Sequence, residues 1–130
     1  MDSPPKVLVV EDFEDLRRLV AVYLDARGYQ VFEAANGKAA IQTARSKNPN
    51  LILLDIRLPD INGVDVVREL RKSSQTKHVP IVGWSAEAES NPQREMLRRA
   101  GISDYIQKPT SLKDLDAVIE RFLPKPKRKH

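Results

Sequence analysis

Residues 51–55 are the stretch that restricts the fold most, because four aliphatic side chains follow one another and then stop at Asp55. A short unbroken apolar run bounded by turn residues is typical of a strand buried on both faces, as in a parallel sheet. The next residues contain Pro59 and Gly63, which mark a loop. Asp55 is therefore predicted at the carboxyl end of a central strand, the edge at which open parallel sheets bind ligands. By position alone, a role in ending the strand or capping the next helix explains Asp55 equally well.

Similar segments recur along the chain and alternate with segments of helical periodicity. The predicted strands are residues 6–10, 29–34, 51–55, 80–85 and 103–107. The predicted helices start near Asp15, at Asn36-Gly37, after Gly63, at Asn91-Pro92 and after Ser111. Each crossover is long enough for a right-handed βαβ unit. The pattern predicts a single α/β domain, in which helices cover both faces of a five-stranded parallel sheet.

Helical spacing also predicts which side chains face the core. The expected inward positions are Leu16, Leu19, Val20, Tyr23, Ala39, Ala40, Ile41, Ala44, Val64, Val67, Leu70, Met96, Leu97, Ala100, Leu112, Leu115, Val118, Ile119 and Phe122. Three basic residues of the third helix, Arg68, Arg71 and Lys72, are expected to be solvated. The second strand is more polar than the others, so we expect it at or near an edge of the sheet.

Composition limits the class of protein. A length of 130 residues suits one domain, and the absence of cysteine excludes disulfides and thiolate metal sites. No apolar run approaches the roughly 20 residues that span a bilayer, so we expect a cytoplasmic protein without a membrane segment. The net charge of +4 equals the charge of Lys125, Lys127, Arg128 and Lys129 in the tail. We divide the chain into a leader (1–5), a domain (6–123) and a basic tail (124–130), and a nucleic-acid-binding face on the domain is not indicated.

Polar side chains follow the predicted strands where those strands end. They are Glu11 and Asp12, Asp55, Ser85 and Lys108. Carboxyl ends of parallel strands share one edge, so these groups are expected to converge there. Two like charges about 4 Å apart repel by about 4 kcal/mol at an effective dielectric of 20, so the acids need a proton or a cation between them. Hard oxygen ligands suit Mg²⁺.

Asp55 in such a site can act as a nucleophile and accept a phosphoryl group. Mg²⁺ and the Lys108 ammonium would supply positive charge, and the Ser85 hydroxyl a neutral donor. Taken alone, each residue has a simpler explanation: Glu11 as part of a helix entry, Ser85 as a turn residue, Lys108 as a solvated loop lysine and Tyr105 as an edge-strand aromatic. The prediction depends on their occurrence together, in this order.

These motifs resemble the receiver domain of two-component response regulators. The matching segments are residues 7–12, 53–63, 80–86 and 100–109, and the resemblance covers about residues 6–123. It implies a flavodoxin-like fold and a phosphoryl acceptor served by a sensor histidine kinase or a phosphotransfer protein. It also implies control of a downstream protein partner or effector domain. Such a domain is not an enzyme, beyond assisting its own phosphorylation and dephosphorylation.

The resemblance assigns a role to each residue of the site. Asp55 would be phosphorylated and would ligate Mg²⁺ together with Asp12, while Glu11 would act through water and Arg57 through its backbone carbonyl. Lys108 would pair with the phosphoryl group, and the peptide bond that follows it, to Pro109, is expected to be cis. Ser85 and Tyr105 would change position on phosphorylation.

The sequence departs from the family pattern at Gly83-Trp84, where aliphatic residues are usual, and in the segment up to Gly101, which is about one residue longer and contains Pro92. A tryptophan beside the switch serine is expected either to change the packing of the fourth helix or simply to fill the core. We also expect its ring to lie beside the site.

Other functions stay open at this point. The chain could be an interaction module that has this fold but is not phosphorylated, although the complete acceptor set argues against it. A phosphohydrolase would need a second acid two residues after the nucleophile, where Arg57 stands and cannot act as a base. Binding of nucleic acid through the tail alone is a weak alternative. The chain acts alone, as an adaptor or phosphate shuttle, or belongs to a longer regulator, and we favour the first.

Overall fold

Our computed structural model describes residues 3–86, 92–108, 110–124 and 126. Within these residues strands and helices alternate as predicted. They are β1 (Lys6–Val10), α1 (Glu14–Ala26), β2 (Gln30–Ala34), α2 (Gly37–Lys47), β3 (Leu51–Asp55), α3 (Gly63–Lys72), β4 (Ile81–Ser85), α4 (Arg94–Ala100), β5 (Asp104–Gln107) and α5 (Leu112–Glu120). All strand pairs are parallel, in the order β2-β1-β3-β4-β5. The α/β class, the central position of β3 and the edge position of β2 are confirmed.

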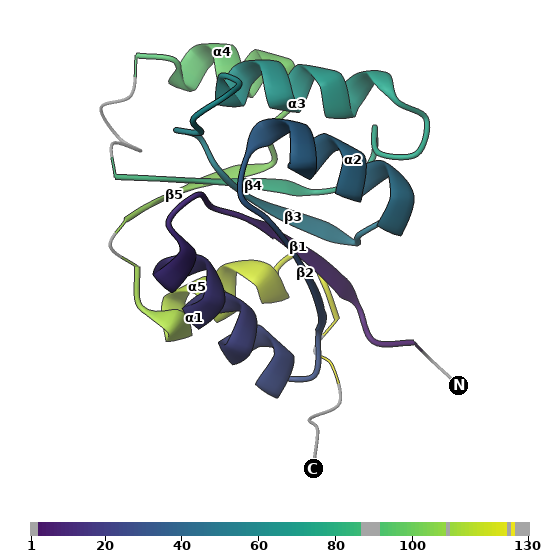
Figure 1. The fold of residues 1–130 in the computed structure, drawn as a ribbon, viewed down its shortest axis with the longest axis vertical. Helices are drawn as coiled ribbons and strands as arrows, with labels where there is room; N and C mark the ends of the chain where they lie inside the picture. The colour runs from purple at the N-terminus through teal and green to yellow at the C-terminus, as the bar shows by residue number, and fades with distance from the viewer. Residues whose placement is uncertain (1–2, 87–91, 109, 125, 127–130) are drawn as a thin grey trace.

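The helices form two layers on the sheet (Figure 1), with α1 and α5 on one face and α2, α3 and α4 on the other. Successive residues of a strand point to opposite faces of the sheet and pack into two separate hydrophobic cores. Leu53, Val82 and Trp84 belong to the core beneath α1 and α5, whereas Ile52, Leu54 and Ile81 belong to the core beneath the other three helices. Because both faces of β3 are covered, its aliphatic run has no exposed side chain.

Several helix boundaries have a local cause. Asn36, Asn62 and Ser111 cap α2, α3 and α5 by accepting hydrogen bonds from backbone N–H groups within the first turn. After α1 and α4 the chain turns at Gly28 and Gly101, whose φ angles of 104° and 108° favour glycine.

Two predicted inward residues are exposed. Leu19 is 54% exposed and Met96 is 45% exposed. In α1 the buried stripe is Val20, Ala21 and Leu24, which leaves Leu19 on the solvent side. In α4 only Leu97 is buried. This short helix packs beside α3 in the same layer, and its other side chains are partly or fully exposed.

The start of α4 also differs from the prediction. The helix begins at Arg94 and is preceded by Gln93, so Pro92 lies in a turn and is not the first helical residue. The predicted cap, Asn91, lies outside the described residues.

The prediction that Arg71 is solvated is wrong. Its guanidinium donates to the carbonyl oxygens of Val79 (2.6 Å), Lys77 (3.1 Å) and Thr76 (3.3 Å), all before β4. It also donates twice to the carbonyl of Gly101, at 2.8 and 3.0 Å. All of these acceptors are main-chain carbonyl oxygens, which carry no net charge. Arg71 therefore fastens the end of α3 to the two loops that lead into β4 and β5.

The opposite layer is fastened by ion pairs. Arg27 of the α1 end lies 2.8 Å from an oxygen of Asp116 in α5. Arg17 of α1 lies 3.1 Å from an oxygen of Glu33 in β2. Ion pairs to carboxylates therefore link α1 to β2 and to α5, whereas Arg71 links α3 to neighbouring loops through main-chain carbonyls.

Trp84 is a core residue of the α1–α5 layer and is 2% exposed. The expectation that it repacks the fourth helix is wrong, because α4 lies across the sheet from it. Its neighbour Gly83 faces the opposite side of the sheet, and a Cβ there would lie 2.6 Å from Cδ1 of Ile102. Isoleucine side chains thus occupy the space that glycine leaves.

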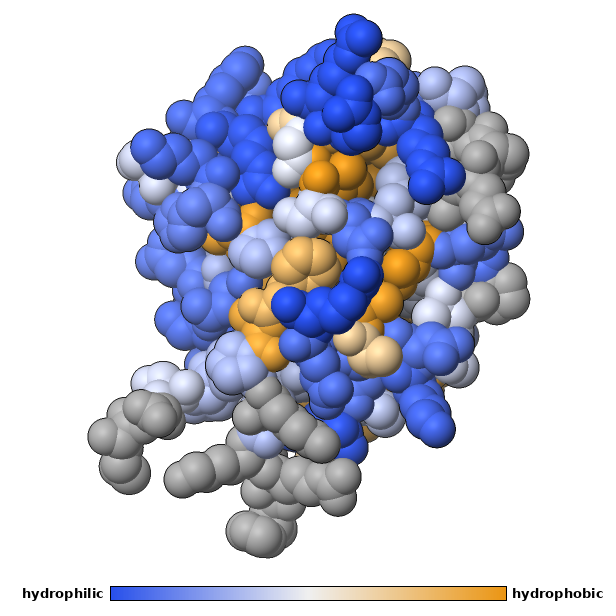
Figure 2. All heavy atoms as spheres, turned by 180° about the vertical axis from the view of Figure 1, so that it is seen from behind, coloured by the Kyte–Doolittle hydropathy of each residue, from blue (hydrophilic) through white to orange (hydrophobic). Residues whose placement is uncertain are grey.

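The surface is mainly hydrophilic, and some apolar side chains reach it across the middle of the face seen in Figure 2. Within the described residues, no helix combines the length and the apolar character needed to cross a bilayer.

Candidate acidic site at the carboxyl edge of the sheet

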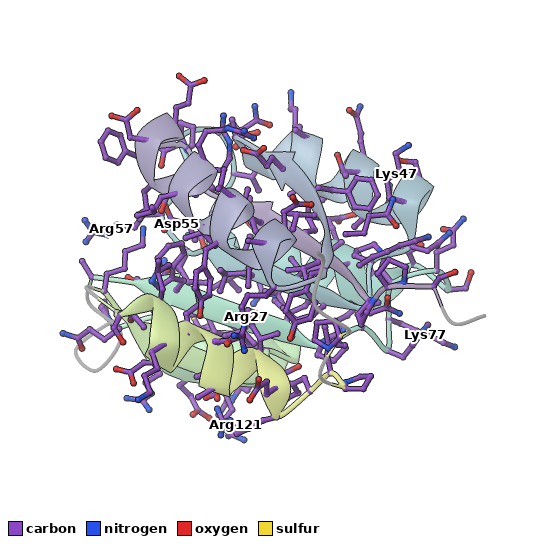
Figure 3. All side chains as sticks on the ribbon, turned by 90° about the horizontal axis from the view of Figure 1, so that it is seen from below. Arg27, Lys47, Asp55, Arg57, Lys77 and Arg121 are labelled. Atoms are coloured by element: carbon purple, nitrogen blue, oxygen red, sulfur yellow. The ribbon has the colours of Figure 1, made fainter. Side chains whose placement is uncertain are left out.

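Three acidic side chains from the ends of β1 and β3 meet at one edge of the sheet. Carboxylate oxygens of Glu11, Asp12 and Asp55 lie within 4.8 Å of one another. The pairing of Val10 with Leu54 on adjacent strands causes this, because both chains leave the sheet side by side. Figure 3 shows Asp55 and Arg57 at one end of the molecule and Lys47 and Lys77 at the other. The predicted convergence of the acids is confirmed in this structure.

Lys108 extends from the end of β5 into the same site. Its ammonium donates a hydrogen bond to Glu11 and lies 3.5 Å from Oδ2 of Asp55. Its backbone N–H donates to the carbonyl of Ser85 at 2.8 Å, which continues the β4–β5 pairing and fixes the base of the side chain. Lys108 is therefore part of the site and is not a solvated loop lysine.

Asp55 is buried, with 4% of its surface exposed. Its Oδ1 accepts a hydrogen bond of 3.0 Å from the backbone N–H of Arg57. Burial raises the pKa of Asp55 to about 7, and the negative charge of Glu11 adds to this rise, while the Arg57 N–H and the charge of Lys108 oppose it. Without a bound cation, the protonated and the ionised form of Asp55 are therefore both populated near neutral pH.

Glu11 shows the opposite shift, although it is almost fully buried. Burial alone would raise its pKa, but hydrogen bonds from Lys108 and from the Phe13 backbone N–H, together with the positive charge of Lys108, lower the pKa of Glu11 below its ordinary value. Glu11 is the carboxylate that stays ionised and holds the lysine. A proton on Asp55 and the Lys108 ammonium thus both relieve the predicted repulsion between the acids.

The acidic site suits a small divalent cation. Its side chains offer carboxylate oxygens only, and a single ammonium does not neutralise three ionised acids. Asp12 is exposed, which leaves the site open to water and to a ligand on that side. Such an incomplete set of hard oxygen ligands is typical of Mg²⁺ sites that keep several waters.

The other predicted residues lie nearby, with different surroundings. Ser85 is buried at the end of β4, one residue after the partner of Asp55. Tyr105 is partly buried and packs on the core beneath α2, α3 and α4, across the sheet from Trp84. Arg57 has an exposed side chain and reaches Asp55 through its backbone. Pro109 lies outside the described residues, so the predicted cis peptide stays a prediction.

One contact of the site was not predicted. The Lys108 ammonium lies 4.6 Å from the centre of the Trp84 ring. Trp84 is paired with Asp55 on the neighbouring strand, so its ring does lie beside the site as expected. The signal for the contact was the position of Trp84 one residue before the strand end, but the sequence does not reveal the register between two strands.

Comparison with known proteins identifies this arrangement. The family model of the response regulator receiver domain matches residues 7–120. The chain therefore belongs to the response regulator receiver domain family, and its sheet is that of the flavodoxin-like receivers.

Individual relatives support the same conclusion. The polar-differentiation response regulator DivK of Brucella anthropi is 33% identical over 120 residues, which cover 92% of this chain and 97% of that protein. The chemotaxis protein CheY4 of Vibrio cholerae is similar in structure, with a TM-score of 0.85 and 29% identity over 92% of this chain and 99% of that chain. The receiver domain of the sensor histidine kinase PA1611 from Pseudomonas aeruginosa has a TM-score of 0.84 and 31% identity, over 92% of this chain and 97% of that chain. That structure is described with a magnesium ion coordinated in its active-site cleft.

Proposed function

We propose that this receiver accepts a phosphoryl group on Asp55 from a phosphohistidine donor and thereby changes conformation to control a partner protein. The observation that carries the proposal is the buried Asp55 carboxylate, with the Lys108 ammonium 3.5 Å away and the Glu11 and Asp12 carboxylates within 4.8 Å. A reactive carboxylate at a strand end, next to a lysine and a cation site, meets the electrostatic needs of phosphoryl transfer.

The chemistry of transfer follows from the charges of the site. An ionised Asp55 oxygen attacks phosphorus, the P–N bond of the phosphohistidine breaks, and its electron pair leaves with the imidazole. Lys108 stabilises the charge on the transferring oxygens, and Glu11 keeps that lysine oriented. Asp12, Asp55 and the Arg57 carbonyl would hold Mg²⁺, with Glu11 acting through water. The bound ion supplies positive charge to the phosphoryl oxygens.

The response to phosphorylation involves two further residues. Ser85 lies at the end of β4, the strand next to Asp55, and its hydroxyl would bond the phosphoryl group. Tyr105 lies on the strand beyond, on the side of α4, and would change rotamer with it. The group can shift an existing equilibrium only through its different affinity for the two conformations.

The proposal extends to partners and location. A sensor histidine kinase or a phosphotransfer protein would donate the phosphoryl group, and a downstream protein or an effector domain would read the new conformation. The receiver would span residues 6–123, act in the cytoplasm and be no enzyme beyond its own phosphorylation and dephosphorylation. Mg²⁺ in the cleft of the PA1611 receiver supports the assignment of the cation.

Incubation with acetyl phosphate and Mg²⁺, followed by intact mass measurement, tests the proposal. Wild type is expected to gain one phosphoryl group, and Asp55→Asn none. Asp65→Asn is the matched control, because this exposed aspartate on α3 lies outside the site. Wild type that stays unlabelled while a known receiver is labelled in parallel would favour an interaction module without phosphorylation.

A further inference from the structure

The Trp84 ring is held in the core and contacts the side chain of Lys108, a flexible residue type. Trp84 is 2% exposed and packs between the sheet and the α1–α5 layer. The ammonium of Lys108 lies over this ring, 4.6 Å from its centre. This distance is within the range in which the negative face of an indole attracts a cation. The Trp84 ring is therefore a third partner of Lys108, after Glu11 and Asp55.

A bound divalent cation would compete with Lys108 for two of its three partners and leave the third unaffected. Glu11 and Asp55 belong to the acidic site, so a bound cation competes with Lys108 for their oxygens and repels the ammonium. The indole of Trp84 is neutral and offers no ligand atom for Mg²⁺. Its attraction for Lys108 remains when the carboxylates are engaged.

Lys108 also has space into which it can move. A hollow of about 270 Å³ opens beside it, lined by Leu16, Trp84, Ala86, Lys108 and Thr110. A lysine that is repelled from the acids could turn into this hollow, away from Asp55. Lysine has many rotamers, so a contact that keeps the ammonium at the site reduces the entropy lost when the ammonium engages a phosphoryl group.

We propose that Trp84 is a positioning residue for phosphoryl transfer: its ring keeps the Lys108 ammonium beside Asp55 while a cation occupies the carboxylates. This inference rests on the proposed function of Asp55. It assigns Trp84 a role that an aliphatic side chain at this position could not provide, because an aliphatic side chain fills the core without attracting a cation.

Trp84 is the only tryptophan of the chain, so fluorinated tryptophan added during expression changes this ring alone. Fluorine weakens the negative face of the ring and hardly changes its shape. The rate of phosphorylation by acetyl phosphate with saturating Mg²⁺ is expected to fall stepwise with the number of fluorines, by roughly fivefold across the series. Mg²⁺ affinity is expected to stay constant. Equal rates throughout the series would overturn the proposal.

Two variants separate attraction from packing. In Lys108→Met the slow residual rate is expected not to depend on fluorination, and an equal dependence there would overturn the proposal. Trp84→Phe retains a weaker ring face and is expected to react faster than Trp84→Leu, whereas equal rates would indicate packing alone.

A measurement without metal or donor tests the contact itself. Protons on the Lys108 carbon next to the ammonium are expected to show upfield ring-current shifts in the NMR spectrum of metal-free wild type, and ordinary shifts in Trp84→Leu. Ordinary shifts in wild type would refute the contact. If wild type accepts no phosphoryl group, the proposed function fails; if it is phosphorylated at one rate across the fluorinated series, that function stands and only the role of Trp84 fails.

Discussion

Replacing Asp55 with asparagine is expected to stabilise the metal-free protein. Asp55 is buried beside Glu11, and this raises its pKa from 3.8 to about 7. The folded state therefore binds the Asp55 proton more tightly than the unfolded state does. The stability that this group contributes is complete below pH 3.8 and is lost as the pH rises through about 7. Asparagine resembles the protonated carboxyl and carries no such loss.

The pKa difference sets the size of the effect. A shift from 3.8 to about 7 is roughly three units, and each unit corresponds to about 1.4 kcal/mol. Asp55→Asn is thus expected to raise the free energy of unfolding by roughly 4 kcal/mol at pH 8 and by roughly 2 kcal/mol at pH 5. Lys108 keeps Glu11 as its charged partner in the variant, so the substitution leaves no unpaired buried ammonium.

Urea denaturation followed by circular dichroism, in EDTA at a series of pH values, measures the difference directly. Asp65→Asn on the exposed face of α3 controls for a general loss of negative charge and is expected to change stability little. Mg²⁺ should stabilise wild type more than Asp55→Asn and so narrow the gap. A variant no more stable than wild type at pH 8, or a gap that is the same at pH 5, would refute the reasoning.

Three further results are expected. Arg71→Met should lower the free energy of unfolding by about 3 kcal/mol in urea titrations, because several part-buried main-chain carbonyls lose a charged donor at once; a loss below about 0.5 kcal/mol would contradict this role. Gly83→Ala should cost about 1 kcal/mol through the contact with Ile102, and the double variant with Ile102→Val should recover most of it; an additive loss would show that this contact is not the cause. Trp84 fluorescence should change when beryllofluoride and Mg²⁺ are added to wild type and stay constant in Asp55→Asn; constant fluorescence in wild type with proven ligand occupancy would be inconsistent with a ring beside the site.

Local pattern was enough to predict the architecture. The strands β1, β3 and β4 each carry a short apolar run, and the polar character of β2 identified it as an edge strand. Individual side chains on the helices were harder to predict. Leu19 fits a helical apolar stripe, but the buried stripe of α1 is narrow and passes through Val20. Arg71 was expected in solvent, because its position in the helical pattern does not indicate that carbonyls of the following loop and of the distant Gly101 accept its hydrogen bonds.

The acidic site was predictable because parallel strands bring their carboxyl ends together whatever their exact register. Glu11, Asp55 and Lys108 therefore meet as the order of the motifs indicated. The pKa shifts of the two buried acids were not predictable, since they depend on which carboxylate the lysine reaches. The Trp84 contact depends on the pairing of that residue with Asp55, which periodicity does not specify.

The two helical layers differ in how they respond to dissolved salt. Ions in solution screen the attraction of Arg17 for Glu33 and of Arg27 for Asp116, the ion pairs that link α1 to β2 and to α5. The hydrogen bonds that Arg71 donates to main-chain carbonyls join one charge to neutral groups and are screened less. Added salt would therefore weaken the attachment of α1 more than the attachment of α3 to the loops that lead into β4 and β5.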